Sequence, residues 1–147
     1  MFDRKHVGHR FDPYQVEVER GAIRSFAVAI GETNPINTDE AAARMAGYRS
    51  TVAPLTFLAS VVAQCPNSFP VAGLLGFSEE HVLHSGQSYE YFDDICAGDL
   101  LVLEEKVADI YDKKDGALNF VITETEVRNQ DRALVAVTRE TLVVRGA

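Results

Sequence analysis

The chain is poor in basic residues, in cysteine and in long apolar runs, and each shortage excludes a class of protein. Its 147 residues hold 14 lysines and arginines against 22 aspartates and glutamates, which gives a formal charge of -8. Such a surface has no basic field that would attract nucleic acid or an anionic bilayer. The longest apolar runs, such as 71–77, are too short to span a membrane, and residues 1–6 carry charges where a signal peptide needs an apolar core. We therefore expect a cytoplasmic protein that binds neither nucleic acid nor membranes.

The cysteines and the other nucleophiles show no familiar catalytic or metal-binding pattern. Cys65 and Cys96 lie far apart with no second pair nearby, so they match neither a zinc site nor a CxxC motif. Ser60 lies outside any Gly-x-Ser-x-Gly elbow, and the segment 73–76 lacks the lysine of a phosphate-binding loop. We predict no metal and no cofactor. With 46% hydrophobic residues, the chain is expected to form a single domain over residues 1–147.

The spacing of apolar residues predicts an α+β fold. The predicted strands are 14–18, 81–92, 100–111, 118–127 and 134–144, the last four forming an antiparallel meander. The predicted helices are 23–30, a short helix that Thr38 caps and Gly47 ends, and a third that runs from Pro54 to Pro66. The third helix is apolar nearly all round, so it must be buried. This order favours an antiparallel sheet wrapped around one long buried helix, the hot-dog architecture.

The segment from Gly31 to Asp39 is the most informative part of the chain. It reads Gly-Glu-Thr-Asn-Pro-Ile-Asn-Thr-Asp and resembles the Gly-Asp-x-Asn-Pro-x-His-x-Asp loop of MaoC-like (R)-specific hydratases and dehydratases. In that family the Asp and the His share the proton transfers that add water to an acyl thioester or remove it. Glu32 and Asn37 occupy these two positions here.

The resemblance covers nearly the whole chain. It extends to residues 52–57 at the start of the apolar helix, to 82–87 in the next strand, and to the turn 97–99. It is closer to the N-terminal-dehydratase branch, which includes the non-catalytic subunits of mycobacterial-type (3R)-hydroxyacyl-ACP dehydratase. The resemblance implies a hot-dog fold and an acyl-CoA or acyl-ACP substrate.

Three departures from the family pattern argue against catalysis by this chain alone. The amide of Asn37 cannot exchange a proton near neutral pH. The longer side chain of Glu32 displaces its carboxylate by about an ångström, which can cost about a hundredfold in rate. Catalytic relatives open the central helix with a His-Gly pair whose glycine N–H donates to the thioester oxygen, but Ala53-Pro54 stands here and proline has no N–H. The N–H of Leu55 is a possible replacement.

The leading hypothesis is a subunit of an acyl-thioester dehydratase or hydratase heterodimer. The partner chain would carry the intact Asp/His loop, while this chain shapes the acyl channel. The predicted substrate-binding residues are Asn34, Pro54, Leu55, Phe57, Leu58, Val61 and His84. The alternatives are a homodimer that binds acyl thioesters without turnover, a thioesterase that uses Glu32 to activate water, and a self-sufficient hydratase.

Several of these residues also have structural interpretations. Glu32, Asn34 and Asn37 can brace the loop through bonds to nearby backbone. Histidine is a residue type suited to acid/base chemistry, which makes His84 a candidate, but a strand histidine at a sheet or subunit contact is the alternative. The residues Arg44 and Arg49 are the candidates for a local basic patch that would attract an acidic carrier protein.

Overall fold

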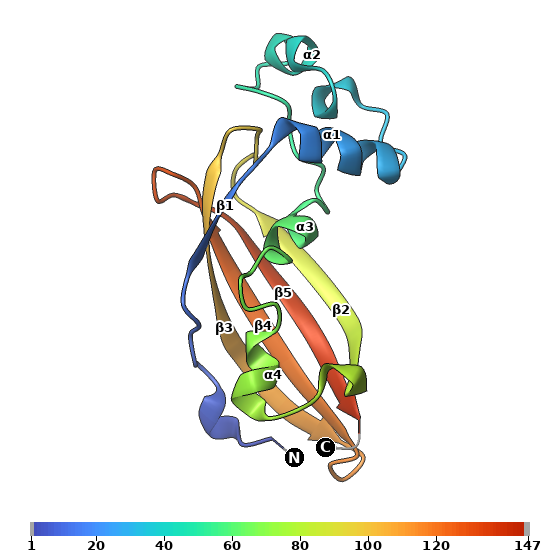
Figure 1. Cartoon of the computed structure of the whole chain (residues 1–147), viewed down its shortest axis with the longest axis vertical. Coiled ribbons are helices and arrows are strands. Elements are labelled where there is room, and N and C mark those ends of the chain that lie inside the picture. Colours follow the sequence, from blue (N-terminus) through green and yellow to red (C-terminus); the bar gives the residue numbers. More distant parts are fainter. Residues whose placement is uncertain (1, 146–147) are drawn as a thin grey trace.

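A computed structural model describes residues 2–145, which are built around one antiparallel sheet (Figure 1). Its five strands are β1 (Tyr14–Glu17), β2 (Val82–Tyr91), β3 (Leu100–Lys113), β4 (Leu118–Arg128) and β5 (Leu134–Arg145). They lie in the order β1-β3-β4-β5-β2. The α+β hot-dog prediction is confirmed, and the strand bounds differ from the predicted ones by at most two residues.

The predicted meander is correct for β3, β4 and β5 but wrong for β2. This strand pairs with β5 at the far edge of the sheet, instead of with β3. Alternation along a strand shows which of its faces is buried, but it carries no information about which strand lies alongside.

Helices lie on one face of the sheet and at one of its ends (Figure 1). The α-helices are α1 (Arg20–Ala29), α2 (Glu40–Met45), α3 (Leu58–Val62) and α4 (Pro70–Leu75), and the 3-10 helices are η1 (Arg4–His6), η2 (Pro35–Asn37) and η3 (Glu79–His81). Figure 1 shows α3 and α4 along the sheet, and α1 and α2 beyond its end. No helix within residues 2–145 has the length and apolar composition needed to cross a bilayer.

The central helix is much shorter than the sequence predicts. Regular α-helix is confined to α3, and tighter turns flank it, with N–H to C=O bonds from Phe57 to Pro54 (2.9 Å) and from Cys65 to Val62 (3.2 Å). The segment is also amphipathic, since Val61 is fully buried whereas Leu55 is 70% exposed. The apolar composition of a segment shows that its side chains can be buried. It does not show that residues of the same chain cover each of them.

The ends of the other helices follow local chemistry. Asp39, and not Thr38 as predicted, caps α2, because the Asp39 carboxylate accepts the N–H of Ala42 at 3.1 Å, whereas Thr38 is the residue that ends η2. Helix α4 lies in a segment predicted as a connection. A proline at its first position and Gly76 in the left-handed region (φ +73°) after its end are the signals that would have found it.

Candidate functional site

The loop between α1 and η2 is held by hydrogen bonds between its own side chains and its own backbone. The exposed carboxylate of Glu32 accepts the N–H groups of Thr33 and Asn34, both at 2.9 Å. The side-chain oxygen of Asn34 accepts the N–H of Ile36 at 3.2 Å and so caps η2. Glu32 and Asn34 therefore have the geometry of the loop-bracing interpretation.

Asn37 ties this loop to the segment that leads into α3. Its side chain is buried, and its Nδ2 donates to the backbone oxygen of Val52 at 2.7 Å. The N–H of Val52 donates in turn to the backbone oxygen of Ile36 at 3.0 Å. In MaoC-like hydratases this position holds the His that transfers protons. Here Asn37 takes its place, and its amide is a fixed hydrogen-bond donor.

An ion pair between the buried Asp99 and the half-exposed Arg49 holds the other side of this segment. Asp99 is 3% exposed, accepts the N–H of Cys96 at 2.8 Å, and binds the guanidinium of Arg49 through both carboxylate oxygens. The turn 97–99 thereby anchors the strand-like segment to which Asn37 is bonded. Arg49 is neutralised by this pair and Arg44 by Glu40 at 2.8 Å, so these two arginines do not form the free basic patch considered from the sequence.

The start of the central segment has a free backbone donor. Pro54 is buried and has no N–H to donate, as expected from the sequence. Within residues 2–145, the Leu55 N–H donates no hydrogen bond. Tyr91 donates its hydroxyl to the Leu55 carbonyl, and burial raises the pKa of Tyr91 to about 12. The next amide after the proline is therefore available to a bound group.

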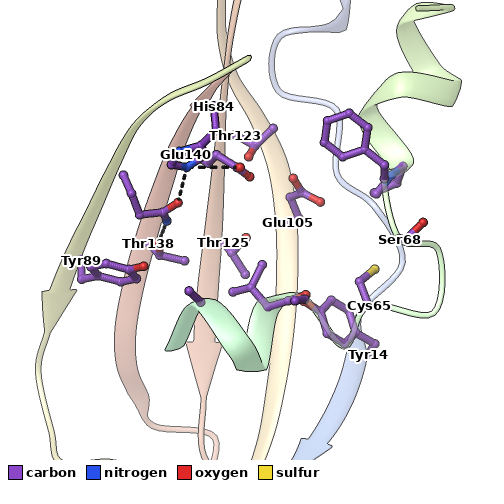
Figure 2. Close-up of a pocket in the computed structure, with 16 residues that line it drawn as sticks. Tyr14, Cys65, Ser68, His84, Tyr89, Glu105, Thr123, Thr125, Thr138 and Glu140 are labelled. Atoms are coloured by element: carbon purple, nitrogen blue, oxygen red, sulfur yellow. Dashed lines mark hydrogen bonds and ion pairs between the residues drawn. The ribbon is translucent and has the colours of Figure 1, made fainter. Parts of the chain in front are cut away.

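A cavity of about 370 Å³ lies between α3 and the sheet (Figure 2). Its helix side is formed by Ala59, Val62 and Ala63, and the linker after α3 adds Cys65, Ser68, Phe69 and Pro70. The strands contribute polar side chains, which Figure 2 shows pointing into the cavity. The cavity is larger than a packing defect and falls within the range of small-molecule sites.

Most of the predicted substrate-binding residues lie away from this cavity. Only His84 lines it. Phe57, Leu58 and Val61 are buried at 3%, 1% and 0% exposure in the core around β1 and β3, so the opposite face of α3 lines the cavity. Helical periodicity identified the apolar residues correctly but could not tell which face of an all-apolar segment would meet the sheet.

His84 belongs to a small polar group at the wall of the cavity. Its Nε2 lies 3.0 Å from the side-chain oxygen of Gln87 and 3.4 Å from a carboxylate oxygen of Glu140. Burial raises the pKa of Glu140, and the neighbouring His84 lowers it in part. Sequence reasoning missed Gln87 and Glu140, and alternation along β2 and β5 was the signal that placed them on one face. Within the described residues, no three His, Cys, Asp or Glu side chains converge on a possible metal site.

An antiparallel sheet over a short central helix, with an Asn-Pro loop beside the start of that helix, defines a MaoC-like hot-dog dehydratase fold. Residues 5–138 match the family described as FAS1-like, dehydratase domain region, and the chain belongs to this family. It is 32% identical to a UPF0336 protein of Streptomyces avermitilis, over 99% of this chain and 96% of that protein. It is 35% identical to a UPF0336 protein of Parafrankia, over 91% and 86% of the two chains.

The fold is also similar to solved structures of MaoC-like dehydratases. A MaoC-like dehydratase superposes with a TM-score of 0.84 at 26% identity, over 97% of this chain and 43% of that chain. A chain of the HadBC (3R-hydroxyacyl-ACP dehydratase) complex of Mycobacterium tuberculosis superposes with a TM-score of 0.76 at 26% identity, over 93% and 96%. The resemblance to MaoC-like dehydratases is therefore confirmed.

Proposed function

We propose that this chain is a subunit of an acyl-thioester (3R)-hydroxyacyl dehydratase, or (R)-specific enoyl hydratase, whose partner chain supplies the Asp/His dyad. The observation that carries the proposal is the hydrogen bond from the Asn37 side chain to the Val52 carbonyl. Because of this bond, the residue at the position of the dyad His serves to hold the loop in place. The similarity to a chain of the HadBC complex supports a second hot-dog chain as the partner.

The chemistry divides between the two chains as follows. Dehydration needs a base for the α-proton, an acid for the departing hydroxyl, and N–H donors for the charge that develops on the thioester oxygen. Asn37 can do neither proton transfer, and Glu32 already accepts two backbone N–H groups. The proton transfers are therefore assigned to the partner's loop.

The chain itself contributes binding groups. The Leu55 N–H is positioned at the start of the central segment, where it can donate to the thioester oxygen in place of the donor lost at Pro54. We assign the acyl channel to the face of α3 formed by Ala59, Val62 and Ala63, and His84 stays a substrate-binding residue as predicted. The carrier, CoA or ACP, is bound outside this channel.

The test is hydration of crotonyl-CoA by the purified chain and by its complex with a hot-dog chain that carries the intact loop. We expect no hydration by the chain alone and turnover by the complex. Replacing the partner's loop His should abolish this turnover, whereas Glu32→Gln in this chain should leave it within about twofold, because the Glu32 carboxylate serves its own loop.

Other results would support the other functions. Substantial hydration by a homodimer of this chain would refute the need for a partner. Hydrolysis of acyl-CoA that is lost in Glu32→Gln would establish a thioesterase. Binding of acyl-CoA without turnover, in the presence of every catalytic partner chain tested, would favour a non-catalytic homodimer.

A further inference from the structure

The sheet face that α3 and α4 cover changes from apolar to polar and back again along the strands. The register of the strands aligns its side chains in rows that cross the sheet. In order, the rows are Leu103–Val127–Ala136, Glu105–Thr125–Thr138–Tyr89, Val107–Thr123–Glu140–Gln87 and Ile110–Val121–Leu142. The outer two rows belong to the two hydrophobic clusters of the protein. The middle two rows form what we name the polar band.

The cavity lies on the polar band. Six of its lining residues are polar side chains of this band: Gln87, Glu105, Thr123, Thr125, Thr138 and Glu140. Figure 2 shows the side chains of Glu105, Thr123, Thr125, Thr138 and Glu140 on three adjacent strands, on the side of the sheet where α3 lies. A core that served only stability would continue the apolar rows through this region, since burial of polar groups costs free energy.

The Thr125 hydroxyl stands at the cavity without a bond to another residue. Thr125 is 3% exposed and lines the cavity, and within residues 2–145 its side chain makes no hydrogen bond. Its neighbour Thr138 is satisfied, because it donates to the Ser88 carbonyl at 3.0 Å and accepts from Gln87. Buried polar groups in proteins are almost always hydrogen-bonded. The Thr125 hydroxyl is therefore available to a group that enters the cavity.

The charges around the cavity restrict what that group can be. Glu105 projects into the space (Figure 2), and burial raises the pKa of Glu105 while the nearby Thr123 hydroxyl lowers it in part. Glu140 lies on the same face and adds to the rise. Two carboxyl groups oppose a phosphate or a carboxylate, whereas a hydroxyl can donate to a carboxylate and accept from Thr125.

The size and shape of the cavity fit an elongated ligand that is apolar at both ends and polar in the middle. At about 30 Å³ per water-sized group, the cavity of about 370 Å³ holds roughly a dozen such groups. Successive rows are separated by two residues along β4 and β5, or roughly 6.8 Å. A ligand that follows the strands would meet apolar rows at both ends and hydrogen-bonding groups over the middle.

We propose that the polar band binds a hydroxyl group in the middle of the acyl chain, so that this subunit selects mid-chain hydroxylated acyl thioesters over plain ones of equal length. The selection acts through binding and needs no catalytic residue of this chain. It rests on the proposed function only in assuming that the acyl group arrives as a thioester.

The experiment compares decanoyl-CoA with its mid-chain hydroxylated analogues by isothermal titration calorimetry, using the full chain and its complex. We expect at least one hydroxylated analogue to bind about three- to tenfold more tightly than decanoyl-CoA, the usual effect of one hydrogen bond. Thr125→Val, which keeps the shape and removes the hydroxyl, should abolish this preference.

A matched control is available. Thr51 is 1% exposed, and its hydroxyl also lacks a partner within the described chain, but it does not line the cavity. Thr51→Val should leave the preference unchanged. Glu105→Gln is a second cavity variant, which tests the same site if Thr125→Val does not fold.

The outcomes separate this inference from the proposed function. Equal affinity for plain and hydroxylated acyl-CoA, with no effect of Thr125→Val or Glu105→Gln, overturns the inference and leaves the function intact. If no acyl-CoA binds but free hydroxy acids bind with the expected preference, the cavity assignment stands and the thioester function fails. If neither class binds, the cavity holds water only and both are overturned.

Discussion

Removing the partner of a buried carboxylate gives the sharpest test of how this fold holds its loop. We expect Arg49→Met to destabilise the chain, because it leaves Asp99, with a side chain only 4% exposed, without its cation. Breaking a buried pair in this way typically costs about 3–5 kcal/mol. The Arg49 side chain is 47% exposed, so water already screens part of the attraction, and we expect the lower end of the range, about 3 kcal/mol.

The size of this effect is measurable by chemical and thermal unfolding. For a chain of 147 residues, about 3 kcal/mol corresponds to a fall in Tm of roughly 10 °C. The control is the double variant Arg49→Met/Asp99→Asn, in which a neutral amide replaces the stranded carboxylate and its oxygen can still accept the Cys96 N–H. The double variant should be more stable than Arg49→Met alone. A fall of less than about 1 kcal/mol in Arg49→Met, or strictly additive effects in the cycle, would refute the reasoning.

Three further predictions use other parts of the structure. Because burial raises the pKa of Glu105, the ionised carboxylate destabilises the folded state, so Glu105→Gln should be more stable than wild type at neutral pH. Its advantage should disappear below the ordinary pKa of glutamate; equal Tm values for the two proteins across this pH range would contradict the argument. Cys65 lines the cavity whereas Cys96 is 1% exposed, so a bound hydroxyacyl-CoA should slow alkylation of Cys65, detected by mass spectrometry, while Cys96 stays unmodified with or without ligand. Gly31 has φ +74° with no atom within 4 Å of an added Cβ, so Gly31→Ala should cost about 1–2 kcal/mol through backbone strain alone; an unchanged free energy of unfolding would show that the turn relaxes.

Much of the loop could be predicted because its chemistry is local. The identity of residues 31–39 showed that an amide and a longer carboxylate replace the usual acid/base pair, and Gly31 indicated the end of α1. The bond from Asn37 to Val52 could not be predicted, because these residues are 15 positions apart and helix α2 lies between them. The role of the turn 97–99 was hidden for the same reason, since Asp99 acts on Arg49, 50 positions away.

The central segment shows a different limit. Its apolar residues were recognised, but the face that meets the sheet was not, because every face of the segment offers apolar side chains. Only packing against β1 and β3 selected Phe57, Leu58 and Val61 for the core and left Ala59 and Ala63 facing the cavity.

The sequence by itself determined the positions of the strands, the α+β class and the altered chemistry of the loop, because alternation, turn residues and side-chain functional groups are local properties. The tertiary structure alone decided that β2 lies at the far edge beside β5 and that Glu105, Thr125, Thr138 and Tyr89 fall in one row. Alternation with a period of two shows which face a side chain takes, but the register between strands depends on the packing of the whole sheet. The polar band is a product of that register.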